Sequence, residues 1–181
     1  TTQKPNQVID AISDYYQNHN SNIHRAVHAL AEESTEAFEE TRDIVARFLN
    51  IEDSREIVFV RGTTEAINLV AYAWGRDNVK EGDIIVTTEY EHHSNIVPWQ
   101  LLTQETKAQL KYIDIDDNGE LMIEQLDDYL ATGKVKLVTF SHMSNVLGTI
   151  SPVDEIISKC KNAGVLTLID GAQSVPHMKV N

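Results

Sequence analysis

Two adjacent histidines, His92 and His93, follow one short apolar run and precede another. An imidazole in such a place can bind a metal ion, move a proton or stack on a flat ring. A paired metal site is the poorer interpretation, because neighbouring side chains on extended backbone point to opposite faces. The single cysteine, Cys160, excludes an internal disulfide and a cysteine-rich zinc cluster. We therefore expect no metal site.

A second candidate is the run Gly62-Thr63-Thr64, which opens a predicted helix after another apolar run. The first backbone N–H groups of a helix have no partner within it, and the helix dipole adds positive potential there, so a phosphate is a natural ligand. The alternative is that Thr63 or Thr64 only caps the helix. The run is neither a P-loop nor a dinucleotide-binding turn.

Two more polar residues, Asn145 and Asp170, follow the last two apolar runs. The amide of Asn145 is suited to bind a ligand, or equally to stabilise a loop through local hydrogen bonds. A carboxylate at the end of a buried strand is costly unless a cation or several donors meet it. Asp170 is therefore either a helix cap or a counter-ion for a cationic ligand.

The segments that position these residues alternate along the chain between apolar patterns typical of helices and apolar runs typical of strands. Helices are predicted over 6–19, 34–50, 64–74, 95–106, 123–131 and 153–163. Strands are predicted over 56–60, 83–87, 110–115, 136–140 and 165–169. This alternation predicts an α/β fold with a mainly parallel sheet. The strands are continuously apolar, so we expect helices on both faces of the sheet.

Ligands of such sheets bind outside the carboxyl ends of the strands, where the candidate residues should meet. Thr63 and Thr64 would supply a phosphate site, His92 a flat ring, Asn145 an amide and Asp170 a carboxylate. Pyridoxal 5′-phosphate (PLP) carries a phosphate, an aromatic ring and a pyridine nitrogen whose proton a carboxylate can hold. The residues together predict a PLP site.

Composition limits the partners. The formal charge of −13 argues against nucleic acid, because binding of phosphates needs a basic face. No apolar run approaches the roughly 20 residues of a membrane span, and we see no targeting leader. We expect a cytoplasmic protein that binds neither nucleic acid nor a membrane.

The sequence resembles the class V aminotransferase family, and within it the cysteine desulfurases of the SufS/CsdA (selenocysteine lyase-like) type. The resemblance rests on IHRAVHAL (23–30), FVRGTTEAINLVA (59–71), EHHSNIVPWQ (91–100), SHMSNVLGT (141–149) and DGAQSVPH (170–177). These stretches span nearly the whole chain. The resemblance implies the large domain of the three-layer, fold-type I PLP-dependent transferases.

The resemblance also implies roles for residues around the cofactor. His92 would stack on the pyridine ring, while Asp170 would pair with the ring N1–H and keep it protonated. Gln173 would contact the ring hydroxyl, and Thr63 and Thr64 would hold the phosphate.

On the substrate side, Asn145 would lie beside the ring near the substrate carboxylate, and His24 would line the site. His92 and His24 are thus the expected catalytic residues. The implied reaction converts L-cysteine into L-alanine and an enzyme persulfide, which supplies sulfur for iron–sulfur cluster assembly. L-Selenocysteine is a second implied substrate, and a homodimer and a SufE- or SufU-like sulfur acceptor are implied partners.

The chain departs from the family where covalent chemistry is needed. The family's Schiff-base lysine, persulfide cysteine and carboxylate-binding arginine have no counterpart in residues 1–181, nor has the small C-terminal domain. Cys160 is no substitute, because it falls within a predicted helix. We expect a partial large (PLP-binding) domain that is inactive alone. The alternatives are another class V PLP enzyme, either a β-lyase or an aminotransferase, and a non-catalytic sulfur-transfer scaffold.

Overall fold

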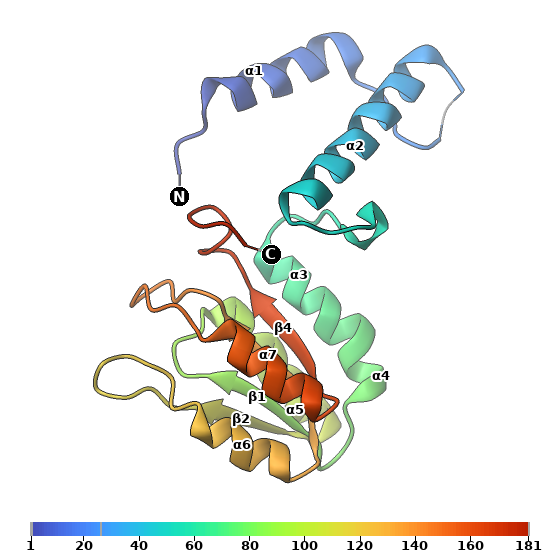
Figure 1. The fold of residues 1–181 in the computed structure, drawn as a ribbon. Coiled ribbons are helices and arrows are strands. Elements are labelled where there is room, and N and C mark those ends of the chain that lie inside the picture. The colour runs from blue at the N-terminus through green and yellow to red at the C-terminus, as the bar shows by residue number, and fades with distance from the viewer. Residues whose placement is uncertain (1, 26, 181) are drawn as a thin grey trace. The chain divides into compact units, whose positions relative to one another are not determined.

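The computed structural model describes residues 2–25 and 27–180. The chain forms two compact units, with the division between Phe59 and Val60. Figure 1 shows helices in the first unit and a sheet with helices in the second.

The first unit is helical. It contains α1 (Asn6–Asp14), a π-helical turn η1 (Tyr15–His19), α2 (Ala29–Phe48) and a 3₁₀ turn η2 (Ser54–Glu56). The helix predicted over 6–19 is confirmed, with a widened last turn. The helix predicted over 34–50 is also confirmed, but it begins earlier.

The early start of α2 has a local cause. His28 lies at the N-cap in extended backbone, and its side chain accepts a hydrogen bond from the backbone N–H of Ala31. This bond satisfies one of the N–H groups that a helix start leaves free. Histidine is not among the preferred N-cap residues, so the sequence gives little warning of it.

The strand predicted over 56–60 is wrong. Residues 57–60 belong to no strand, and no described segment pairs with them. Ile57 is extended, as a β-branched residue favours, but its carbonyl accepts a hydrogen bond from the Arg42 guanidinium rather than from a neighbouring strand. Val58 and Phe59 are exposed. An apolar run becomes a strand only where another strand offers its backbone groups.

The second unit contains a sheet of four parallel strands. They are β1 (Ile84–Thr88), β2 (Gln109–Ile113), β3 (Val135–Ser141) and β4 (Leu166–Asp170), in the order β2-β1-β3-β4. These are the remaining four predicted strands. The expected α/β fold with a mainly parallel sheet is therefore confirmed.

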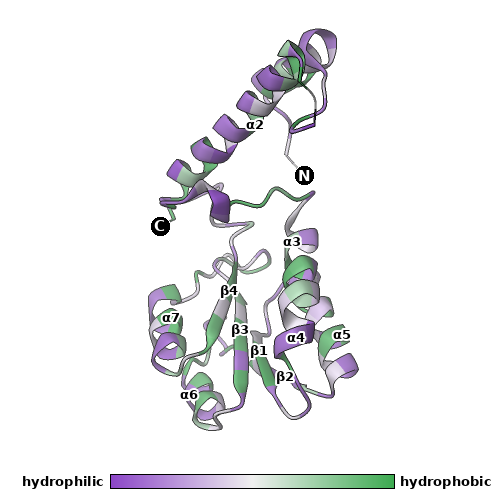
Figure 2. Cartoon of the chain, turned by 90° about the vertical axis from the view of Figure 1, so that its right-hand side faces the viewer, coloured by the Kyte–Doolittle hydropathy of each residue, from purple (hydrophilic) through white to green (hydrophobic). Residues whose placement is uncertain are grey.

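Helices cover both faces of this sheet. Figure 2 shows α6 (Glu124–Ala131) and α7 (Val153–Asn162) on one face. The other face carries α3 (Thr63–Val70), which continues through the π-helical turn η3 (Ala71–Gly75) into α4 (Arg76–Asn78), and α5 (Val97–Thr106). Their bounds agree with the predicted helices to within a few residues.

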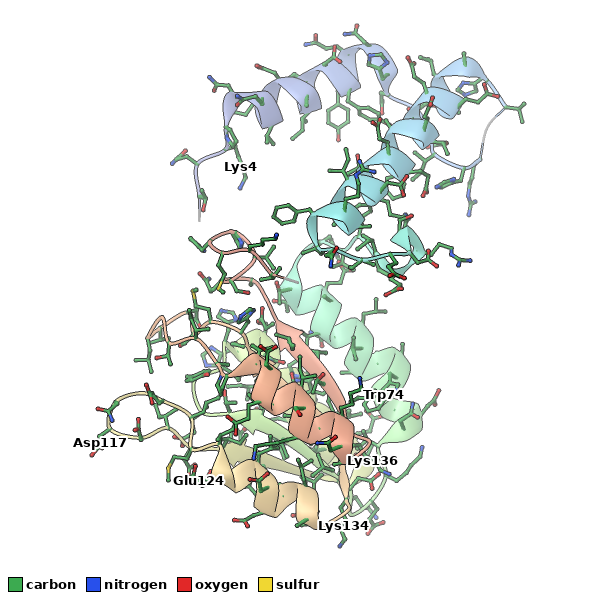
Figure 3. All side chains as sticks on the ribbon, viewed as in Figure 1. Lys4, Trp74, Asp117, Glu124, Lys134 and Lys136 are labelled. Carbon is green, nitrogen blue, oxygen red and sulfur yellow. The ribbon has the colours of Figure 1, made fainter. Side chains whose placement is uncertain are left out.

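Two apolar clusters hold these layers together. Successive side chains of a strand point to opposite faces, so Ile84 and Val86 pack in one cluster and Ile85 in the other. The first cluster lies under α6 and α7 and includes fully buried Leu126; the second includes fully buried Trp99 of α5. Side chains fill the space between sheet and helices (Figure 3). Among the described residues, no helix is both long and apolar enough to span a membrane.

The first cluster gives a stability prediction. Leu126→Ala should lower the free energy of unfolding by about 2–5 kcal/mol, because it opens a cavity under the sheet. Leu101→Ala on α5 is the control: this leucine is 58% exposed, so the change should be below about 1 kcal/mol. Urea denaturation measures both. Equal losses would contradict the packing described here.

Candidate functional site

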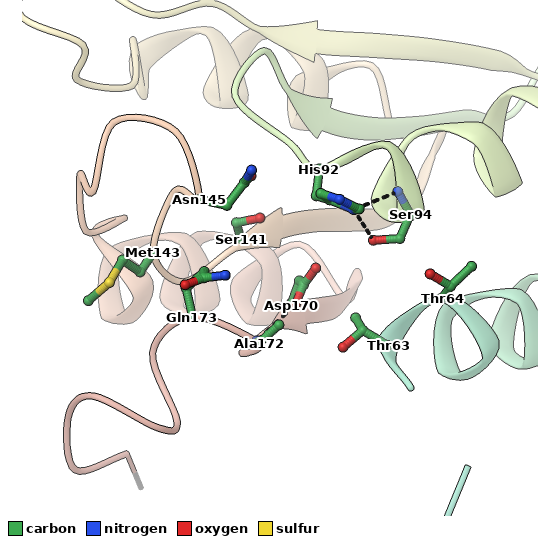
Figure 4. A pocket seen from close by; sticks show the side chains of 10 residues that line it. All are labelled: Thr63, Thr64, His92, Ser94, Ser141, Met143, Asn145, Asp170, Ala172 and Gln173. Carbon is green, nitrogen blue, oxygen red and sulfur yellow. Dashed lines mark hydrogen bonds between the residues drawn. The ribbon is translucent and has the colours of Figure 1, made fainter. Parts of the chain in front are cut away.

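A pocket lies at the carboxyl ends of the parallel strands. Its volume is about 540 Å³, part of which is open to solvent. Ten side chains line it (Figure 4): Thr63, Thr64, His92, Ser94, Ser141, Met143, Asn145, Asp170, Ala172 and Gln173. Six of them are residues that the sequence singles out, and all ten belong to the second unit.

The start of α3 forms one wall of the pocket. Gly62 occupies the N-cap, where no side chain makes a cap hydrogen bond, and the helix begins at Thr63. The alternative that a threonine hydroxyl caps this helix is therefore not what the structure shows. Thr63 is half-buried and Thr64 exposed, and both face the pocket from the positive end of the helix dipole. This arrangement suits an anion.

His92 contributes an imidazole of defined tautomer. Its Nδ1 accepts a hydrogen bond from the backbone N–H of Ser94 at 3.1 Å and lies 2.8 Å from the Ser94 hydroxyl oxygen (Figure 4). An Nδ1 atom that accepts a hydrogen bond carries no proton, so the neutral ring carries its proton on Nε2. The ring of His93 is 6.2 Å away and does not line the pocket.

Asp170 contributes a buried carboxylate with few partners. The residue is 7% exposed, and its Oδ1 accepts a hydrogen bond from the Ala172 N–H at 2.9 Å. Within residues 2–25 and 27–180 its carboxylate makes no ion pair and accepts no further hydrogen bond. Turns, not a helix, follow it, so a cap to a next helix is not its role in the described part. The second oxygen is free to meet a cationic or N–H group.

Two amide side chains complete the pocket. Asn145 lies on the loop after β3, and Gln173 on the turn after β4; both are exposed. Figure 4 shows both among the side chains that surround the space above Asp170. These amides can donate and accept hydrogen bonds toward a polar ligand.

Four lining residues were not predicted from the sequence: Ser94, Ser141, Met143 and Ala172. Each lies within three residues of the end of a strand or of a predicted site residue. None of the four side chains is charged or strongly nucleophilic, so their residue types give no signal, and only their position near a strand end could have indicated them.

His24 lies in the first unit, where its Nε2 is 3.1 Å from the Glu39 carboxylate and its ring meets Phe38 edge-on. Its substrate-side role stays a prediction. In the part of the chain that the structure describes, no group of three or more His, Cys, Asp or Glu side chains could hold a metal ion.

The comparisons with known proteins all indicate one family. The family model described as "Aminotransferase class-V" matches residues 1–181. A "Cysteine desulfurase" of Synechococcus elongatus is 55% identical over 183 residues, which cover 100% of this chain and 29% of that protein. The chain thus spans less than a third of this relative.

Two solved structures resemble the chain closely. A cysteine desulfurase from Thermococcus onnurineus, in its apo form, matches with a TM-score of 0.93 and 40% identity, covering 100% of this chain and 44% of the other. The cysteine desulfurase CsdA from Escherichia coli matches with a TM-score of 0.86 and 33% identity, covering 98% and 44%.

Cys160 lies outside the pocket. It is fully buried in α7 against the first apolar cluster. Burial disfavours the thiolate and raises the pKa of this thiol to about 11. The thiolate is the reactive form, so at neutral pH this residue is a packing group.

We predict that native Cys160 resists alkylation by iodoacetamide from pH 7 to pH 9, because the raised pKa keeps the thiol protonated throughout that range. In urea, where the side chain is solvated, its reaction should accelerate strongly. Mass spectrometry of the peptide that contains Cys160 measures both rates. Rapid native labelling near pH 7 would contradict the assignment.

Proposed function

The chain belongs to the aminotransferase class-V family, and from its similarity to cysteine desulfurases we propose that it is the PLP-binding part of such an enzyme. The observation that carries the proposal is the pocket, in which a helix N-terminus, an oriented imidazole and a buried carboxylate without a cation face one space. Each matches a different part of the cofactor.

The pocket residues fit PLP. The phosphate would bind at the start of α3, held by the hydroxyls of Thr63 and Thr64 and by free backbone N–H groups. The carboxylate of Asp170 would meet the protonated ring nitrogen, which satisfies its open oxygen. The amide of Gln173 would contact the ring hydroxyl.

Bound PLP supplies an electron sink for bonds at the substrate α-carbon. Asp170 would sustain this property, because a carboxylate beside N1 holds the proton there. Its burial strengthens the attraction, since few water molecules screen it.

His92 would lie against one face of the ring. Its Nδ1 accepts from Ser94 and its Nε2 carries the proton of the neutral ring, so Nε2 is the atom at which this side chain can donate a hydrogen bond toward the ligand. The exposed amide of Asn145 would orient the carboxylate of L-cysteine near the ring. His24 would line the substrate side, as the resemblance implies.

The proposed overall reaction transfers one sulfur atom. L-Cysteine and an enzyme thiol give L-alanine and an enzyme persulfide: the Cβ–S bond breaks, an S–S bond forms, and a proton replaces sulfur on Cβ. The lining residues described here include neither lysine nor cysteine. We therefore propose that the lysine, the nucleophilic cysteine and the small domain belong to a longer polypeptide, and that residues 1–181 alone are inactive.

The wider role is also a proposal. We assign the persulfide to a SufE- or SufU-like acceptor and to iron–sulfur cluster assembly in the cytoplasm, with a homodimeric enzyme and L-selenocysteine as a second substrate. The similarity to cysteine desulfurases supports this role.

The full polypeptide that contains this chain should bind PLP and release L-alanine from L-cysteine, with sulfide formed when a reductant is present. Residues 1–181 alone should release none. Amino-acid analysis and a sulfide assay measure both. Pyruvate and ammonia as the products would point instead to a β-lyase, and dependence on a keto acid to an aminotransferase. Absence of any turnover or PLP absorbance would favour a scaffold.

Asp170→Asn in the full polypeptide should lower kcat about 100-fold or more, because the neutral amide no longer holds the N1 proton electrostatically. Asp154→Asn, at an exposed position in the first turn of α7, is the matched control and should leave kcat unchanged. Steady-state kinetics on PLP-saturated enzyme measures both. An Asp170→Asn variant with near-normal kcat would remove this residue from the proposed role.

A further inference from the structure

Glu91, the residue before His92, is outside the pocket but bonded to its walls. We propose that the Glu91 carboxylate is a positioning group, which fixes the His92 imidazole relative to Asp170. The inference rests on the proposed function of the pocket and adds a residue that touches neither cofactor nor substrate.

The carboxylate of Glu91 is buried and fully engaged. The residue is 8% exposed. Its Oε1 accepts hydrogen bonds from the Thr88 hydroxyl at 2.5 Å and the Ser141 backbone N–H at 2.8 Å. Its Oε2 accepts from the Asn95 amide at 2.6 Å and the Ser141 hydroxyl at 2.7 Å. No cation of the described residues pairs with it, so four neutral donors stabilise this carboxylate.

These donors come from three different segments. Thr88 ends β1, Asn95 belongs to the turn η4 (His93–Asn95) after His92, and Ser141 ends β3, fifty residues further along the chain. Parallel strands need no such link to pair. The carboxylate therefore ties the loop that carries His92 to the end of a neighbouring strand.

A second layer of bonds fixes the partners of Glu91. The Asn95 amide oxygen accepts hydrogen bonds from the Trp99 indole at 3.0 Å and from the Thr139 hydroxyl at 2.6 Å. Asn95 and Trp99 are both fully buried. The amide cannot turn over without losing these bonds, so its N–H group stays directed at Glu91.

The end of β3 also pairs with Asp170, the last residue of β4. Ser141 is the register partner of Asp170 in the β3–β4 pair, and the His142 N–H donates to the Asp170 carbonyl at 3.0 Å. Glu91 thus links the backbone of His92 to the strand pair that carries Asp170. Those two side chains are proposed to meet a ring face and a ring nitrogen, so their separation has to be set closely.

A carboxylate is specifically required at this position. All four partners donate, and an ionised carboxylate accepts at both oxygens. A glutamine of the same shape would direct its NH₂ group at a fixed donor in either orientation. That donor is the Asn95 amide N–H on one side or the Ser141 backbone N–H on the other. One bond would be replaced by a donor–donor contact, which shifts the loop rather than unfolding the sheet.

The test uses the full-length enzyme loaded with PLP. Glu91→Gln should lower kcat about tenfold to a hundredfold with a much smaller change in KM, the scale expected when a reacting group is displaced by about 1 Å. It should also weaken the visible circular dichroism of bound PLP, which reports how the ring sits in its chiral site.

Glu89→Gln is the matched control, because Glu89 is an exposed glutamate two residues away on the same loop. It should leave kcat and circular dichroism unchanged. If Glu91→Gln does not fold, Thr88→Val replaces one donor by a methyl group of similar size and should shift both readouts in the same direction, but less. Unchanged kcat and circular dichroism per bound PLP in the folded variant, even with a lower melting temperature, would overturn the inference.

The two proposals fail differently. If the wild-type polypeptide neither binds PLP nor releases alanine, the proposed function is wrong. If the wild type is active and Glu91→Gln or Thr88→Val matches it in both readouts, only the role of Glu91 is wrong.

Discussion

Parallel strand pairing is the constraint on which the rest of the second unit depends. Every strand of the sheet points the same way, so each loop that follows a strand emerges at one edge. The pairing of Ser141 with Asp170, and of β1 with β3, brings together residues far apart in the chain. The pocket is a consequence of this pairing and of helices that bury both faces of the sheet.

Two buried carboxylates at this edge differ in their surroundings. Glu91 accepts four hydrogen bonds from neutral donors, so its charge is satisfied within the protein. Among the residues that the structure describes, Asp170 accepts one, from Ala172, and its second oxygen has no partner. An ionised group with unused acceptor capacity gains most from a ligand that donates to it, whereas a satisfied group gains nothing. The first is therefore suited to hold structure and the second to hold a ligand.

Much of the second unit was predictable from the sequence, because its strands are short and β-branched and its helices carry an apolar stripe. The grouping of Thr63, His92, Asn145 and Asp170 was predicted from the rule that ligands of parallel sheets bind outside the carboxyl ends of the strands. The features that could not be predicted depend on side-chain contacts between segments that are distant in the sequence. The strand over 56–60 was predicted from composition, but the Arg42 side chain takes the Ile57 carbonyl. The role proposed for Glu91 depends on Ser141, fifty residues away, and no periodicity encodes such a contact.

The chain's own chemistry is the orientation of groups and the control of protons. Its pocket offers hydroxyls, amides, an imidazole and a carboxylate, which bind and polarise but form no lasting covalent bond to a cofactor. Its only thiol is in the apolar core with a pKa raised to about 11, where a thiolate is disfavoured. A thiol that attacks sulfur has to be ionised and accessible, whereas a thiol packed in the apolar core is neutral and buried. The two tasks are therefore separated: the residues proposed to hold the ring follow strand ends, and an accessible nucleophile is expected outside the described pocket.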